Sequence, residues 1–196
     1  MLKRIVVGER ERALVSRSGR FLRILEPGAH YVAALPFTVG VERHTLDDRR
    51  MSSAWSGFLA TQRRAIAERH FVIVTTGPRE VAVVYADGKF LEIHGPGSCA
   101  LYWKSAASIG VRIIDAHAAP DVPREVLRAI AHTGAFPFIV GVLVEEGRTG
   151  TLYLGNRLAR TLGPGMYAFW EFASPRVVAS HPCTPALDLA GQGLRS

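Results

Sequence analysis

The chain has 196 residues, of which 48 % are hydrophobic and 21 % are charged. This balance is typical of a folded globular protein and excludes a largely disordered chain. A formal net charge of +7 permits contact with nucleic acid or with an anionic membrane surface, but it requires neither. The sequence has no apolar run of the roughly 18 residues that a spanning helix needs. Two distant cysteines, Cys99 and Cys183, favour a reducing, cytoplasmic compartment over a disulfide framework.

Residues 1–45 form the first predicted unit, which is built of short β-strands. A β-branched run around Ile5 is followed by a polar link, and two further strands flank Gly19. The pair Pro27-Gly28 then turns the chain back into another strand.

Residues 46–69 interrupt this β pattern. Trp55, Phe58, Leu59 and Ile66 recur at helical spacing, which predicts a connecting helix within residues 53–69.

Residues 70–115 repeat the first pattern. Asp87-Gly88 predicts a hairpin turn, Pro96-Gly97 predicts a second turn, and the aromatic pair Tyr102-Trp103 follows. We expect that aromatic pair to lie in the core of the unit.

Residues 116–137 again change character. Pro123 suits the first turn of a helix, and Val126, Leu127 and Ile130 form an apolar stripe that Gly134 ends. A second connecting helix is therefore predicted within residues 122–133.

Residues 138–180 form the third predicted unit, with Asn156, Pro164-Gly165 and Phe169-Trp170 in the corresponding places. The interval from Gly19 to Pro27 equals that from Gly88 to Pro96 and that from Asn156 to Pro164. The fold class predicted is α+β, mainly antiparallel β, with three repeated hairpin units joined by two helices. Residues 181–196 read as a tail.

The nine residues of the repeated turns are interpreted as structural. Gly or Asn at the hairpin tips tolerates positive φ, and each Pro-Gly pair suits a type II turn. We therefore expect Asn156 to take positive φ and Asn156→Gly to be neutral or slightly stabilising, whereas Gly88→Val should cost stability. The nine residues are Gly19, Pro27, Gly28, Gly88, Pro96, Gly97, Asn156, Pro164 and Gly165.

The search for chemistry predicts no catalytic, cofactor-binding or metal site. His181 and Cys183 resemble half of a metal site, and His94 lies close to Cys99 in the sequence, but no second pair has zinc spacing. The adjacent acids Asp47-Asp48 and Glu145-Glu146 fall in polar links, where solvation explains them.

Several arginines gather in the first unit, where they offer a candidate nucleic-acid surface. A solvated strand face accounts for them better, because their alternation along the strand is not clean. They are Arg10, Arg12, Arg17, Arg20 and Arg23.

The stretch from Glu11 to Val15, together with Gly19-Arg20 and Leu25-Glu26-Pro27-Gly28, resembles the opening of bacterial slipins. These belong to the stomatin, prohibitin, flotillin and HflK/C group, also called SPFH or Band 7. The later Val-Tyr-x-x-Gly-Lys and Leu-x-Pro-Gly-x-x-x-Phe-Trp stretches are similar to repeats that one slipin branch carries ahead of its Band 7 domain. His94 departs from this pattern, because it replaces an apolar residue.

The resemblance implies a module without enzymatic activity, used for assembly or partner binding in a membrane-associated scaffold. The Band 7 domain itself is expected to be missing, since the similarity ends near Leu187-Asp188-Leu189. The implied partners are a protein or a second copy of the chain, with possible peripheral contact with anionic lipid at the inner face of the membrane. A basic nucleic-acid-binding protein and a small enzyme with an active site between repeats stay open as alternatives.

Overall fold

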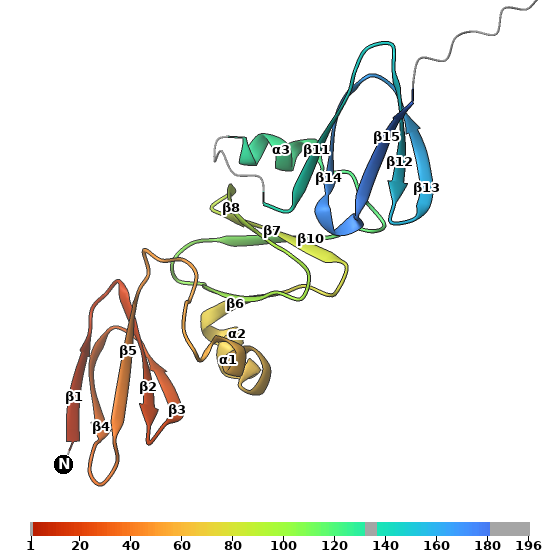
Figure 1. Ribbon diagram of the computed structural model, residues 1–196. Coiled ribbons are helices and arrows are strands. Elements are labelled where there is room, and N and C mark those ends of the chain that lie inside the picture. Colours follow the sequence, from red (N-terminus) through yellow and green to blue (C-terminus); the bar gives the residue numbers. More distant parts are fainter. Residues whose placement is uncertain (1, 132–136, 181–196) are drawn as a thin grey trace, which may run out of the picture. The chain divides into compact units, whose positions relative to one another are not determined.

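The computed structural model describes residues 2–131 and 137–180, and it is mainly antiparallel β with three short α-helices (Figure 1). This confirms the predicted α+β class at the level of secondary structure. The chain divides into two compact units, residues 1–114 and residues 115–196.

The first unit begins with five strands in two small antiparallel sheets. One sheet pairs β1 with β4, and the other has the order β3-β2-β5. The strands are β1 Leu2–Val7, β2 Glu11–Arg17, β3 Arg20–Leu25, β4 Gly28–Ala33 and β5 Val39–Thr45.

Five further strands begin after two helices and pair in the same way. One sheet pairs β6 with β9, and the other has the order β10-β7-β8. The strands are β6 Phe71–Thr75, β7 Glu80–Ala86, β8 Lys89–His94, β9 Cys99–Trp103 and β10 Ile109–Asp115.

The strands of the second compact unit follow this order once more. One sheet pairs β11 with β14, and the other has the order β13-β12-β15. The strands are β11 Ile139–Val144, β12 Thr149–Leu154, β13 Arg157–Leu162, β14 Gly165–Trp170 and β15 Pro175–Ser180, with a 3-10 turn η1 at Glu171–Ala173.

A β-bulge marks the same place in the three hairpins. The strand register shifts so that Leu22 of β3, Leu91 of β8 and Ala159 of β13 each lack a partner on the facing strand. Each bulged residue stands three positions after the second residue of its hairpin turn. A bulge bends and twists its strand locally, so the three hairpins share their curvature as well as their pairing.

The hairpin tips use two kinds of turn. Ser18-Gly19 and Asp87-Gly88 take positive φ at both central positions (48° and 73°, 51° and 76°), as a type I′ turn requires. In the third hairpin Gly155 takes positive φ (60°) and Asn156 does not, which is the arrangement of a type II′ turn with Gly first. The expectation that Asn156 adopts positive φ is therefore wrong, because the preceding glycine already reverses the chain.

The Pro-Gly pairs also differ from one another. Gly97 has φ 68° within a turn, which fits the type II geometry expected after Pro96. Gly28 and Gly165 have φ values of 129° and 148° and are the first residues of strands β4 and β14. The glycines take positive φ in all three places, but only the φ of Gly97 fits a type II turn.

Each pair of sheets encloses a small core. In the first set of strands this core contains Ile5 and Val7 of β1 with Val15 and Val32 of the facing strands. At the position of Val32 the later sets carry Tyr102 and Phe169, and both aromatic rings are fully buried. The neighbouring Trp103 and Trp170 are buried too, which confirms that the aromatic pairs belong to the core.

The first connector is two helices and not one. Helix α1 runs over Ser56–Gln62 and α2 over Arg64–His70, with Arg63 between them at φ −126° and ψ 39°. The aromatic side chains of Phe21, Trp55 and Phe58 pack at ring-centroid distances of 5.7–6.2 Å. The non-helical conformation of Arg63 therefore separates the two short helices.

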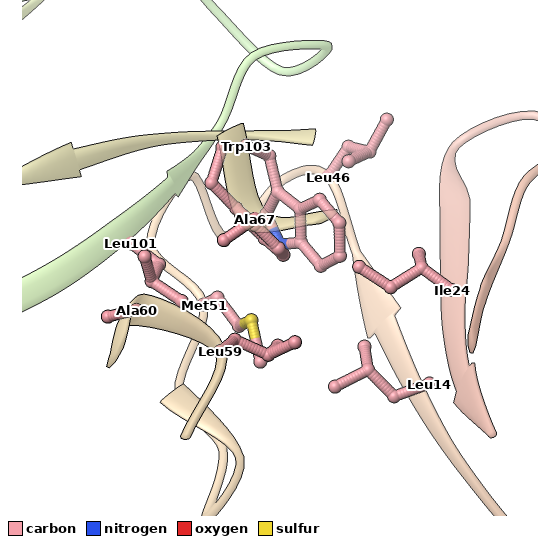
Figure 2. Close-up of a cluster of buried hydrophobic side chains, with 10 residues drawn as sticks. Leu14, Ile24, Leu46, Met51, Leu59, Ala60, Ala67, Leu101 and Trp103 are labelled. Atoms are coloured by element: carbon pink, nitrogen blue, oxygen red, sulfur yellow. The ribbon is translucent and has the colours of Figure 1, made fainter. Parts of the chain in front are cut away.

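A larger hydrophobic cluster holds the first unit together (Figure 2). Leu14 and Ile24 come from the first set of strands, Leu59 and Ala67 from the helices, and Trp103 from β9. Because the cluster draws on strands from both sets, the two sets and the helices between them fold as one body.

The second connector contains helix α3, Arg124–Ile130, which begins directly after Pro123. Val126 and Ile130 are fully buried, as the apolar stripe predicted. The helix is shorter than the range 122–133, and Gly134 lies outside the described residues.

Candidate functional site

The connector before the second set of strands extends the edge of its sheet. The Met51 N–H donates to the Leu101 carbonyl at 2.8 Å, and the Trp103 N–H donates to the Arg49 carbonyl at 2.9 Å. Arg50 therefore lies opposite Tyr102 in an antiparallel bridge. The segment 49–51, which we term the first edge segment, covers the outer edge of β9.

The second connector does the same to β14. The Val122 N–H donates to the Ala168 carbonyl at 2.9 Å, and the Trp170 N–H donates to the Pro120 carbonyl at 2.9 Å. Asp121 lies opposite Phe169. The second edge segment, residues 120–122, thus occupies the place that residues 49–51 occupy on β9.

An ion pair holds each edge segment to the neighbouring hairpin. The edge segment supplies the basic residue in the first pair and the acidic residue in the second. Arg50 Nη1 donates to Glu92 Oε2 at 3.1 Å, whereas Arg160 Nη2 donates to Asp121 Oδ1 at 2.5 Å. Glu92 and Arg160 stand at matching positions just after the bulge, opposite Val84 and Leu152. The pairing of opposite charges is kept while the sign on each side is reversed.

The matching residue in the first set of strands is Arg23, opposite Val15. Its guanidinium donates to the Tyr31 carbonyl at 3.3 Å, on the edge of β4 that corresponds to the covered edges of β9 and β14. Within residues 2–131 and 137–180, no segment pairs with this outer edge of β4.

A buried polar network lies beside the first edge segment. The Tyr102 hydroxyl donates to Glu92 Oε1 at 2.6 Å, and His94 Nε2 lies 2.5 Å from the same hydroxyl. Because the hydroxyl hydrogen is directed to Glu92, the histidine must be the donor to the tyrosine oxygen. The chain of donors then runs from His94 through Tyr102 to Glu92, which also accepts from Arg50.

Burial sets the protonation of both rings. It lowers the pKa of His94, against the opposing field of Glu92, and it raises the pKa of Tyr102, where the hydrogen bond to Glu92 acts in the same direction. Both side chains are therefore neutral near pH 7, and hydrogen bonds link them to each other and to Glu92. This arrangement stabilises the edge segment.

An open groove of about 680 Å³ adjoins the network. It is lined by His44, residues 47–50, Ser52, Leu91 and Glu92. Asp47 is largely exposed and forms an ion pair with Arg10, and Glu92 is held by Arg50 and Tyr102. Two of the carboxylates that line the groove, those of Asp47 and Glu92, are thus each paired with an arginine.

Four of the five arginines named in the first unit have contacts within that unit. Arg10 pairs with Asp47, Arg12 donates to the Glu11 carbonyl, and Arg17 lies over the Phe37 ring at 4.6 Å. Arg23 contacts the β4 edge. Each of these cations is engaged locally, which agrees with a solvated strand face.

Two of the weak metal candidates of the sequence, His94 and Cys99, lie within the described residues. His94 is used by Tyr102, and Cys99 is an exposed free thiol. In the part of the chain that the structure describes, no three His, Cys, Asp or Glu side chains gather as a metal site. His181 and Cys183 lie outside the described residues.

Sequence reasoning missed the edge segments, because residues 46–69 and 116–137 were interpreted as helical connectors and Asp47-Asp48 as part of a solvated polar link. A signal was present, since Arg23, Glu92 and Arg160 each stand four positions after the second turn residue of their hairpins. A repeated position that holds Arg, then Glu, then Arg indicates a charged contact, because the residue that pairs with it must change its sign in the same way.

No family model matches the chain, and searches of curated proteins and of solved structures find no significant match either. The resemblance to slipins therefore stays a prediction from the sequence. Among residues 2–131 and 137–180, no helix is long and apolar enough to cross a membrane.

Proposed function

We propose that the chain is a non-catalytic, slipin-like module of three related β units that serves assembly or partner binding in a membrane-associated scaffold. The shared strand order, the bulges and the edge segments support three related units with boundaries near 1–45, 70–115 and 138–180. The function itself rests on one observation, the bare outer face of the β1–β4 sheet.

This outer face carries large apolar side chains in solvent. Leu2, Val6 and Tyr31 are 65 %, 51 % and 58 % exposed, and they lie on one side of the two strands, since Ile5, Val7 and Val32 point inward. Arg4 stands between them, opposite Tyr31. An apolar face with a basic residue is suited to a protein surface or to the boundary of an anionic membrane.

The equivalent face of the β6–β9 sheet is covered by helices. Phe71 and Leu101, which correspond to Leu2 and Tyr31, are essentially fully buried in the cluster that contains Leu59 and Ala67 of helices α1 and α2. The chain therefore covers this face in its second set of strands, whereas among residues 2–131 and 137–180 no helix packs on it in the first set. A partner that covers the β1–β4 face would complete the same arrangement.

The experiment compares binding of the purified full chain to a second copy, to anionic phosphatidylserine vesicles and to DNA or RNA. We expect self-association or vesicle binding, and we expect either to be lost in the double variant Val6→Asp, Tyr31→Asp, because an acidic side chain is repelled by anionic lipid and is unfavourable in an apolar interface. Leu158→Asp is the control, because Leu158 is also a largely exposed apolar residue, on β13. Vesicle binding through Arg4 should also weaken as salt screens the charge.

Tight binding to nucleic acid at physiological salt without binding to vesicles or to a second copy would overturn the proposal. So would hydrolase or transferase activity that depends on Glu92 or His44, since that result would select the enzyme alternative.

A further inference from the structure

We propose that the outer edge of β4 binds the tail of a second copy of this chain by strand addition, with Asp188 of the tail pairing with Arg23. This inference rests on the proposed function and deepens it, because it names the partner and the contact. The same kind of contact occurs twice within the chain, where residues 49–51 pair with β9 and residues 120–122 pair with β14.

The first part of this contact concerns the backbone. On β9 and β14 an incoming segment donates to the carbonyls of Leu101 and Ala168 and accepts from the N–H groups of Trp103 and Trp170. On β4 the corresponding groups are the Tyr31 carbonyl and the Ala33 N–H. Both residues are exposed, and the Tyr31 carbonyl accepts from the Arg23 guanidinium, a contact that an added strand would replace. A strand edge without a paired segment is a template for an added strand.

The second part concerns charge. In the first edge segment Arg50 pairs with Glu92 of β8, and in the second edge segment Asp121 pairs with Arg160 of β13. In both places the residue just after the bulge and the residue of the edge segment carry opposite charges. Arg23 occupies the same position in the first unit. An acidic residue would therefore complement Arg23 at the edge of β4, as Asp121 complements Arg160 at the edge of β14.

The third part concerns the residue directly after the charged one. In both edge segments a buried apolar side chain comes next, Met51 after Arg50 and Val122 after Asp121. The sequence after β15 contains one further pair of this type, Asp188-Leu189, which lies outside the described residues. Its acid matches Arg23 in sign, and its leucine matches Met51 and Val122 in kind.

The consequence for assembly is a head-to-tail contact between copies. The surfaces on the two partners differ, so the interface is heterologous, and such contacts build rings when they close and filaments when they do not.

The test is a charge exchange read by sedimentation velocity over a concentration series of the full chain. We expect Arg23→Asp and Asp188→Arg each to shift self-association to concentrations about tenfold higher, since like charges then face each other. An equimolar mixture of the two variants should associate like the unaltered chain, because the reversed tail of one matches the reversed edge of the other and the two unaltered partners also match. Arg20→Asp makes the same charge change at the exposed hairpin tip and should have no effect.

A second variant tests the backbone contact. Ala33→Pro removes the outward N–H from an edge strand, a place where proline is tolerated, and it should weaken association while the thermal melt stays close to that of the unaltered chain. If Arg23→Asp fails to fold, Ala33→Pro and Asp188→Arg still decide the matter.

The inference fails if the chain is monomeric throughout, or if it associates and neither charge variant nor Ala33→Pro changes that. It also fails if cross-linking places the tail on β4 of the same copy. Association that is lost in the Val6, Tyr31 double variant and is unchanged by the charge variants would retain the proposed function while rejecting the strand addition.

Discussion

At the scale of single residues, glycine conformation separates turns that look alike in sequence. Gly88 takes positive φ at the second position of its turn, whereas in the third hairpin Gly155 takes it at the first position and Asn156 is released from it. A side chain at Gly88 or Gly155 would not clash with neighbouring atoms, because a Cβ at either position would have no atom within 4 Å. The backbone conformation alone therefore favours glycine there.

We therefore expect Gly88→Ala to lower the free energy of unfolding by about 1 kcal/mol, which is the cost of holding an L-residue in the left-handed region. Asn156→Ala, at the matching sequence position, should change it far less, and Gly155→Ala should behave like Gly88→Ala. Urea unfolding of the three variants measures this. A loss at Asn156 as large as that at Gly88 would mean that Asn156 also holds a left-handed conformation.

The buried histidine gives stability a pH dependence. Burial lowers the pKa of His94, and also that of His70, below the ordinary value of 6.5. The unfolded chain consequently takes up protons at higher pH than the folded chain does, and stability must fall as the pH drops below about 6.5.

We expect urea midpoints to decrease from pH 7 towards pH 5, and His94→Gln to make that decrease shallower. His70→Gln provides a second arm, and the double variant should have the flattest profile. Profiles that stay parallel in all variants would show that the carboxylates alone set the pH dependence.

The sequence predicted the residues of the turns and of the aromatic core because these depend on local chemistry. A Gly at a hairpin tip or a Tyr102-Trp103 pair can be recognised without knowing the fold. The polar network could not be derived in that way. His94 stood out as polar in an apolar place, but its donor chain to Tyr102 and Glu92 requires the register of β8 and the position of β9.

At the scale of elements, the strands were predictable and the connectors were not. The β-branched runs and turn signals marked the strands, whereas residues 53–69 have a helical spacing that continues through Arg63, where the chain breaks. The break is a tertiary effect, because Leu59 and Ala67 must both reach the cluster around Trp103 (Figure 2). The residues before that helix became an edge segment for the same reason, since an open strand edge lies next to them.

The cluster makes a quantitative prediction for α1. Leu59 is fully buried, so Leu59→Ala should lower the free energy of unfolding by about 2–5 kcal/mol through lost burial and a residual cavity. The control is Leu158→Ala, which removes the same atoms from a largely exposed side chain and should cost little. Equal, small effects would show that the helices do not support the first unit.

At the scale of the whole molecule, the boundaries of the sequence repeats differ from the boundaries of the compact units. Three stretches repeat the same strand order, but residues 1–114 form one compact unit that contains two of them. Repetition could be read from the intervals between glycines and prolines. The joining of two stretches could not, because it depends on a cluster assembled from Leu14, Leu59 and Trp103.

The exchanged ion pairs bear on how such a chain avoids misfolding. Similar hairpins in one chain allow a connector to settle on the wrong neighbour. At the edge of β4 Arg50 would meet Arg23, and at the edge of β14 it would meet Arg160, so the edge of β9 with Glu92 is the one of the three that complements it. Asp121 is repelled by Glu92 in turn, but Arg23 and Arg160 both carry the charge that it pairs with. The charge on the first connector thus disfavours both wrong edges, whereas the charge on the second disfavours the edge of β9 alone.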